Sequence, residues 1–368
     1  MKAKIPNIFI SVGVLFALTG LLSADKPQPT IITFDAPGAG TGPGQGTHLF
    51  GSQGLNPAEA ITGTSFEANN VFHGYLRARD GTFTTYDVPG AGTEPFDGTF
   101  TNGINPAGAI TGAVTDSSNA THGYVRAKDG TITTFDAPGA DAFTVAHGIN
   151  PAGVIAGHYL DSSNVNHGFV RDANGTITTF DPPGAGTGPG QGTNLNPGCI
   201  NPRGTITGFY FDASSVAHGF VRDANGMITT FDAPGAGALG TLAFSINPAG
   251  TITGLYFDAS SVGHGFVRDA NGTITTLDVP GAGTAPFTGT EPLSINAPGA
   301  ITGLYADESG LYHGLVRAAN GTISTFDAPG AGTAPNQGTN PGCSNPRGAT
   351  TGVYFDSNNV SHGFLRTP

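Results

Sequence analysis

The sequence has few of the residues on which many folds and sites depend. It contains no Trp, only two Cys and two Met, and charged residues make up 11% of the 368-residue chain. Disordered chains combine low hydrophobicity with high charge, so this low charge argues against disorder although 59 residues are Gly and 27 are Pro. After residue 24 no apolar run approaches the roughly 18 residues that a membrane-spanning helix needs, and we expect no membrane span.

Positive charge is also scarce. With 14 Lys and Arg against 26 Asp and Glu, the formal net charge is -12. Such a chain is repelled by polyanions, so we expect neither nucleic acid nor an anionic membrane surface as a partner.

The N-terminus has the pattern of an export signal. Lys2 and Lys4 precede the apolar run "IFISVGVLFALTGLL", and "LSA" ends at the small residue Ala24. This pattern predicts a signal peptide at 1–24, a short leader at 25–29 and a mature domain at 30–368. We therefore expect a secreted or periplasmic protein, without a lipid anchor because no Cys follows the apolar run.

The rest of the chain is an internal repeat with three landmarks, each present seven times. The first is a His-Gly pair at His73, His122, His167, His218, His264, His313 and His362. The second is the Asp of "FDAPG" or a variant at Asp35, Asp87, Asp136, Asp181, Asp232, Asp278 and Asp327. The third is the Asn of "INPAG" or a variant at Asn56, Asn105, Asn150, Asn201, Asn247, Asn296 and Asn345.

The phase of these landmarks predicts how the chain ends meet. The distance from the Asn to the following Asp is 31 residues in six copies, but Asn345 has no such Asp after it and Asp35 has no such Asn before it. The segment "TIITFDAPG" near the N-terminus should therefore supply the strand that the last copy lacks.

Turn signals divide each copy into four strands, A to D. "NPAG" is typical of a type I turn, and "NG" or "DG" indicates a tight hairpin. Strand A ends at the Asn, B at a turn acid, C at the Arg of "HGFVR", and D at "FDAP". The turn acids are Glu67, Asp116, Asp161, Asp212, Asp258, Asp307 and Asp356. Four-stranded sheets repeated seven times bury their faces when stacked radially, so we predict an all-β, seven-bladed β-propeller closed by the N-terminal strand. A β-solenoid is the alternative, but it needs no such phase shift.

The unit "INPAGTITGLYFDASSVGHGFVRDANGTITT" resembles the bacterial extracellular repeat proteins of the HAF type. Their units carry an Ile-Asn-x-x-Gly turn, a Gly-ended strand and then His-Ala-Phe, whereas all seven copies here have Gly in the middle of that tripeptide. The resemblance implies export and a repeat fold, and it implies no reaction.

Length varies only in the D-to-A loops, between 14 and 21 residues from Asp to Asn. A rigid scaffold with one variable face is typical of a binding surface; loops that merely tolerate insertions are the alternative. The candidate ligand-binding residues on this face are Gln45, His48, Phe96, Gln191, Phe287 and Gln337.

Residues that break the repeat suggest a metal site. If Asn150 pairs with Ile155 across the turn, His147 lies opposite His158, with Asp141 in the nearby loop. Two imidazoles and a carboxylate can hold zinc or another transition metal, although two polar residues on a wet rim would look the same.

The remaining recurrent groups are better explained by structure. The turn acids could bind calcium, but they lack its ligand ladder and suit side-chain-capped bends. We expect the Arg of strand C and the Asp of "FDAPG" to neutralise each other inside the repeat. Cys199 and Cys343 occupy matching sites in distant copies, so we expect two separately buried thiols rather than a disulfide.

These observations predict an exported, monomeric, non-enzymatic binding or scaffold module for an unknown extracellular or cell-envelope ligand, with no obligatory cofactor. The alternatives are a secreted hydrolase or lyase with its site over the central channel, and a carbohydrate-binding propeller. The lack of Trp, the best platform for stacking sugars, weakens the last.

Overall fold

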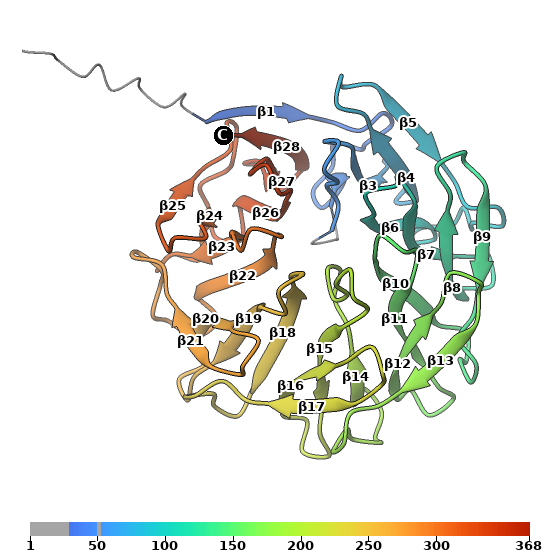
Figure 1. Ribbon diagram of the computed structural model, residues 1–368. Coiled ribbons are helices and arrows are strands. Elements are labelled where there is room, and N and C mark those ends of the chain that lie inside the picture. The colour runs from blue at the N-terminus through green and yellow to red at the C-terminus, as the bar shows by residue number, and fades with distance from the viewer. Residues whose placement is uncertain (1–28, 50–52) are drawn as a thin grey trace, which may run out of the picture.

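The computed structural model describes residues 29–49 and 53–368. The regular secondary structure of these residues consists of β-strands, and Figure 1 shows the strands arranged around a common centre. The prediction of an all-β protein is therefore confirmed. The expected signal peptide and residues 25–28 of the leader lie outside the described residues. No helix in the described part of the chain is long and apolar enough to cross a membrane.

The strands are of the four kinds that the turn signals predict. The A strands are β2 (Gly46–His48), β6 (Gly98–Ile104), β10 (Thr144–Ile149), β14 (Gly192–Asn194), β18 (Thr241–Ile246), β22 (Gly289–Ile295) and β26 (Gly338–Ser344). The B strands are β3 (Ile61–Phe66), β7 (Ile110–Thr115), β11 (Ile155–Leu160), β15 (Ile206–Phe211), β19 (Ile252–Phe257), β23 (Ile301–Ala306) and β27 (Thr350–Phe355).

The other two kinds follow in the same order. The C strands are β4 (Phe72–Arg77), β8 (Thr121–Arg126), β12 (Asn166–Arg171), β16 (Ala217–Arg222), β20 (Gly263–Arg268), β24 (Tyr312–Arg317) and β28 (Ser361–Thr367). The D strands are β5 (Phe83–Tyr86), β9 (Ile132–Phe135), β13 (Ile177–Phe180), β17 (Ile228–Phe231), β21 (Ile274–Leu277), β25 (Ile323–Phe326) and, from the start of the chain, β1 (Thr30–Phe34).

Within a repeat the four strands pair antiparallel in chain order, as β14, β15, β16 and β17 do. The strand at the start of the chain joins the last repeat. β1 pairs antiparallel with β28, from Thr30 opposite Thr367 to Phe34 opposite Gly363 (Figure 1). The phase of the landmarks thus predicts this pairing correctly.

Neighbouring repeats touch through short parallel pairings. A C strand meets the next A strand in the pairs β4–β6, β12–β14, β20–β22, β24–β26 and β28–β2. Single parallel bridges, Thr121 with Phe143 and Ala217 with Gly240, join two further pairs of neighbours. The strand pairings form one 20-stranded and one 8-stranded sheet.

The core of each repeat is built around the aromatic residue of strand C. In "HGF" and its variants that ring is fully buried in all six copies with an aromatic here, Phe169 and Phe220 among them, and its neighbours include the aromatic ring of a D strand. The middle Gly makes room for the D-strand ring of the same repeat: a Cβ on Gly168 would lie 2.6 Å from the ring of Phe180. Because an Ala there would clash, the packing explains why this tripeptide has Gly instead of Ala.

The Arg at the end of strand C does not pair with the Asp of "FDAPG" as the sequence suggests. In six repeats its guanidinium lies over the aromatic ring of the preceding D strand, for example Arg77 over Phe34 at 4.8 Å and Arg222 over Phe180 at 5.0 Å. In the seventh, the D strand that precedes Arg317 has Leu277 in place of the ring. This cation–π contact contributes about 0.5–1 kcal/mol at a half-exposed site, and it joins one repeat to the next. The Asp has a different partner, described below.

Candidate functional site

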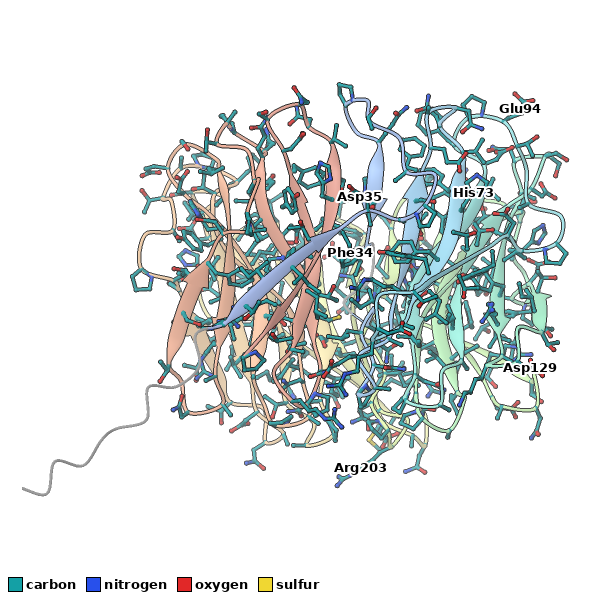
Figure 2. The ribbon with its side chains drawn as sticks, turned by 90° about the horizontal axis from the view of Figure 1, so that it is seen from above. Phe34, Asp35, His73, Glu94, Asp129 and Arg203 are labelled. Carbon is teal, nitrogen blue, oxygen red and sulfur yellow. The ribbon has the colours of Figure 1, made fainter. Side chains whose placement is uncertain are left out.

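The D-to-A loops and the B-to-C bends share one face of the molecule, as predicted. Figure 2 shows Glu94 of a D-to-A loop on one side, with Asp129 of a C-to-D turn and Arg203 of an A-to-B turn on the other. The loops and bends are hydrogen-bonded to each other; for example, Gly190 N of a D-to-A loop donates to Asn164 O of a B-to-C bend. We call this the loop face.

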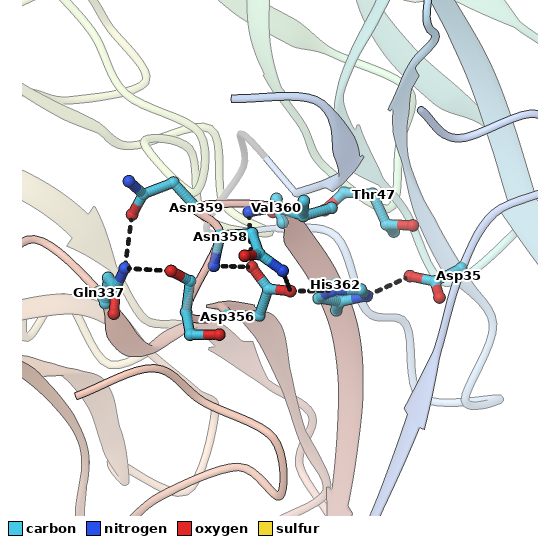
Figure 3. Close-up of polar contacts among 10 residues, drawn as sticks. Asp35, Thr47, Gln337, Asp356, Asn358, Asn359, Val360 and His362 are labelled. Atoms are coloured by element: carbon cyan, nitrogen blue, oxygen red, sulfur yellow. Dashed lines mark hydrogen bonds and ion pairs between the residues drawn. The ribbon is translucent and has the colours of Figure 1, made fainter. Parts of the chain in front are cut away.

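The three glutamines on the loop face hold the loops in place. Gln45 Oε1 accepts from Gly42 N at 2.9 Å, and its Nε2 donates to Ala68 O and to Asn70 Oδ1 in the adjacent bend. Gln191 and Gln337 make the matching contacts, and Figure 3 shows Gln337 with Asn359. Their amides are thus engaged within the chain, which favours a structural role over ligand binding for Gln45, Gln191 and Gln337.

His48 also faces inward. Its Nε2 lies 3.2 Å from Gly44 O, and its ring lies edge-on to Phe66. Burial lowers the pKa of His48, and the bond to Gly44 opposes this effect only partly. The imidazole is therefore neutral near pH 7.

Phe96 and Phe287 are the candidate residues that project outward. Their side chains are 65% and 72% exposed, and both residues have left-handed backbones with φ of 74° and 63°. Gly44 and Gly190 occupy the matching loop position with φ of 79° and 77°. A left-handed backbone costs a bulky residue about 1–2 kcal/mol of conformational free energy. The backbone is therefore strained at the two positions where these aromatic rings are exposed.

A cavity of about 370 Å³ lies at the centre of the molecule. Five A strands or the residues following them contribute to its wall. The lining residues are Leu49, Asn196, Pro197, Phe244, Glu291, Leu293, Leu304, Tyr312, Asn340 and Gly342. A hollow of about 100 Å³ adjoins the cavity and shares Glu291, Leu304 and Tyr312 with it. Phe287 also lines this hollow, so the two spaces lie side by side between the exposed ring and the centre, and together we call them the groove.

Glu291 is the charged group in this groove. It lies on β22 next to Thr290, whose Oγ1 accepts a hydrogen bond from Val279 N and so points into the repeat. Side chains alternate along a strand, which turns Glu291 to the cavity. Burial raises the pKa of its carboxyl. Burial and the charge of Glu291 both raise the pKa of Tyr312, which places the two side chains close together.

The structure brings His147 and His158 together, but not through the predicted register. A bulge between Ala146 and Gly148 makes His158 pair with Val145, and Ile149 rather than Asn150 pairs with Ile155. The imidazoles still stack, with His147 Nε2 3.1 Å from His158 Nδ1. Burial lowers both pKa values, that of His158 to about 4, so the pair is neutral at pH 7.

Asp141 does not complete a metal site with these two histidines. In the described part of the chain no three His, Cys, Asp or Glu side chains come together as a metal site requires. Asp141 is exposed, and its backbone N donates to Leu160 O.

The repeated His and Asp residues form an array that the sequence did not predict. In each repeat His Nδ1 lies 2.7–3.0 Å from the "FDAPG" Asp, and Nε2 lies 3.5–3.7 Å from the turn acid. Figure 3 shows His362 between Asp356 and Asp35, the latter directly after β1. The turn acids cap their bends as expected, since Asp356 Oδ1 accepts from Asn358 N and Val360 N. Cys199 and Cys343 are buried free thiols, which confirms that prediction.

The comparisons with known proteins identify the architecture. No protein-family model and no curated protein matches the chain. Among solved structures, a catalytically inactive virginiamycin B lyase from Staphylococcus aureus with quinupristin matches with a TM-score of 0.57 at 14% identity, covering 93% of this chain and 100% of the lyase. A streptogramin B lyase matches with a TM-score of 0.55 at 15% identity, covering 92% of this chain and 97% of that one.

The fold is a β-propeller. A prolyl endopeptidase structure also matches, with a TM-score of 0.55 at 10% identity, covering 90% of this propeller but 50% of the endopeptidase chain. At such identities the likeness shows the fold alone.

Sequence reasoning missed Glu291, although a signal was present. Glu291 lies two residues after a Gly at the start of its A strand. Five other A strands have a Gly at the first strand position or directly before it, and the residue two positions after that Gly is never an acid. These residues are His48, Phe100, Asn194, Leu242 and Asn340. A carboxylate among such residues breaks the repeat as clearly as His147 does.

Proposed function

We propose that this β-propeller is an exported, non-enzymatic module that binds a ligand on its loop face, in the groove from Phe287 to the central cavity. The predicted signal peptide supports export, to the periplasm or outside the cell. The HAF-type repeat is part of this proposal, as is a monomeric state.

The proposal includes seven blades closed into a ring. Support comes from the antiparallel meanders of four strands, from the parallel contacts between successive repeats, and from the pairing of β1 with β28. In a ring so closed, a repeat contributes its A strand to the centre, where seven different side chains can meet.

The observation that carries the function is the conformation of Phe287. A phenyl ring that is 72% exposed on a left-handed backbone buries little apolar surface, and the ring contact of Phe287 is an edge contact with Phe257 at 6.1 Å between centroids. Its φ is one that Gly adopts at the matching position of other repeats. Strain of this kind persists where a site needs it, and an exposed ring beside a groove offers a stacking surface to a ligand.

The geometry favours binding over catalysis. Glu291 and Tyr312 are the proton donors and acceptors in the cavity lining, but within the described residues the Tyr312 hydroxyl donates to Asn336 and no hydrogen bond joins it to Glu291, so the two are not held as an acid–base pair. The neutral pair of His147 and His158, which the hydrolase or lyase alternative would use, is not part of the cavity lining or of the groove.

The proposal is tested with benzyl alcohol as a neutral aromatic probe and glucose as a sugar probe, by saturation-transfer NMR. We expect benzyl alcohol to bind, and Phe287→Gly to abolish its signal. Because the substitution relieves a left-handed backbone, the free energy of unfolding should stay the same or rise by up to about 1 kcal/mol. Stronger glucose binding would instead support the carbohydrate-binding alternative.

Met227→Thr is the matched control. Met227 is 71% exposed directly before the D strand β17, and the other six repeats have Thr at that position. This variant should bind benzyl alcohol like the wild type. If Phe287→Gly binds normally, or destabilises the protein by several kcal/mol, Phe287 has a packing role and the proposal fails.

A further inference from the structure

The carboxyl group of Glu291 lies in the wall of the central cavity without a cation beside it. The ion pairs found within residues 29–49 and 53–368 that involve arginine use Glu59, and those that involve histidine use the turn acids and the "FDAPG" aspartates. Burial raises the pKa of Glu291, and no neighbouring charge lowers it again. Glu291 is half-buried, so its ionised carboxylate has lost part of its hydration without gaining a counter-ion, which is costly.

The surroundings of Glu291 combine polar acceptors with apolar walls. Asn196 and Asn340 line the same cavity, and their side-chain carbonyls can accept hydrogen bonds. Phe244, Leu293 and Leu304 supply apolar surface. Tyr312 donates from its hydroxyl to Asn336 Oδ1 at 3.1 Å, which fixes its ring next to the groove.

This chemistry matches a particular class of ligand. An ammonium group would supply the missing counter-ion, donate to the carboxylate and amide oxygens, and lie near the electron-rich face of an aromatic ring. A bare metal ion would need several hard ligands at one point, and no such group occurs in the described part of the chain. The apolar walls instead suit an organic substituent on the cation, and the net charge of -12 attracts cations to the molecule.

We infer that the groove binds a small organic ammonium ion, with Glu291 as its counter-ion and the apolar part of the ligand directed along the groove toward Phe287. This inference names the ligand class of the proposed binding site and therefore rests on the proposed function. The cavity volume of about 370 Å³ is in the range of small-molecule sites.

The test compares benzylammonium with benzyl alcohol, its neutral counterpart of nearly the same shape, by isothermal titration calorimetry. In the wild type we expect benzylammonium to bind at least about tenfold more tightly, which is the size of one desolvated ion pair. Glu291→Gln keeps the shape of the side chain and removes the charge, so this preference should disappear. Because the substitution relieves a buried carboxyl, the thermal midpoint should not fall.

Glu94→Gln is the control for a general effect of negative charge. Glu94 is an exposed acid on the same face (Figure 2), and its substitution should leave the preference for benzylammonium unchanged. If both variants lose the preference equally, the effect is the field of the whole surface and the inference fails.

The remaining outcomes separate the inference from the proposed function. Equal affinity of the wild type for both probes would overturn the inference and leave the proposed function standing. Binding of neither probe would overturn both. A preference for benzylammonium that survives in Glu291→Gln would show that another group is the counter-ion, and it would overturn the inference as well.

The pH dependence gives a further readout. Glu291 and Tyr312 are the titratable side chains among the residues that line the cavity and the adjoining hollow. As the pH falls below the pKa of Glu291, the affinity for benzylammonium should drop by about tenfold per pH unit, because only the ionised carboxylate binds it. The affinity for benzyl alcohol should not change, and parallel changes for the two probes would contradict the inference.

Discussion

The recurrent His lies between two carboxylates in every repeat, and this contact defines what the residue does. Its Nδ1 reaches the Asp at the end of a D strand and its Nε2 faces the turn acid, as for His122 with Asp136 and Asp116. In five repeats the ring also stacks on a Tyr of strand B, such as Tyr210 on His218. The His thus joins strands B, C and D at the loop face and has a structural role.

This contact makes a prediction about pH. Burial alone would lower the pKa of His122, but the hydrogen bond and charge of Asp136, with Asp116 beyond, outweigh it and hold the pKa above 6.5. The folded state therefore favours the protonated ring. Its stabilisation is fully present below pH 6.5 and is lost as the pH rises through the higher pKa of the folded state. The gain is small because the pair is largely exposed and screened by salt.

Two-dimensional NMR of the imidazole of His122 measures this pKa directly. In His122→Gln the free energy of unfolding should lose this part of its pH dependence above pH 6.5, while it is little changed at pH 8. A measured pKa below 6.5 in the folded wild type would contradict the assignment of the two carboxylates as its partners.

Among the elements, the A-to-B turns do more than reverse the chain. The Asn of each turn accepts hydrogen bonds within its own turn, as Asn201 Oδ1 does from Arg203 N and Thr205 N. Its side-chain amide then donates to the next repeat, from Asn201 Nδ2 to Asn247 O at 3.2 Å. Asn105, Asn150 and Asn296 make the same contact with the repeats that follow them. These turns are therefore also joints between neighbouring repeats.

Asn201→Asp tests this joint. The carboxylate keeps the turn acceptors but loses the donor and places an oxygen against Asn247 O, at a residue that is 2% exposed. We expect a loss of roughly 2–4 kcal/mol in the free energy of unfolding, measured by urea denaturation at pH 7.

The opposite exchange in an exposed turn is the matched control. Asp223 Oδ1 accepts from Asn225 N and Met227 N in the same turn geometry, so Asp223→Asn should change stability little. Equal effects of the two substitutions would show that only the turn matters and that the contact between repeats contributes nothing.

For the whole molecule, β1 is the element that ties the chain ends together. Besides its backbone pairing with β28, it brings Asp35 to His362 (Figure 3). It also brings the ring of Phe34 to the guanidinium of Arg77. These contacts join the first repeat to the last. Without them the sheets at both ends would lose their covering neighbours.

A chain that starts at Pro37 should therefore unfold at a lower temperature than one that starts at Thr30. We expect a decrease of roughly 10 °C by differential scanning calorimetry, and a less cooperative transition. A chain that starts at Asp25 is the control and should unfold like the one that starts at Thr30. A transition unchanged by the loss of residues 30–36 would contradict the proposed closure.

The residue pattern was sufficient to predict strand order, turn positions and the partner of β1. These features depend on contacts between residues close in sequence or on the phase of the repeat, and both are visible in the linear chain. The same is true of the loop face, because the variable loops and the B-to-C bends must follow the same ends of the strands. The buried state of Cys199 and Cys343 also followed from their matching positions in distant repeats.

Only the tertiary structure decided which of these residues meet. A bulge at His147 shifted the expected register, because a bulge depends on the twist between two strands and not on their local pattern. Arg77 of strand C stacks on Phe34 of the preceding repeat, and Gln45 hydrogen-bonds to Gly42 in its own loop. Each side chain has several possible partners in the sequence, and which one it contacts depends on how the folded chain buries it. Glu291 is an ordinary strand residue in sequence; it becomes a candidate counter-ion because the A strands converge on one cavity.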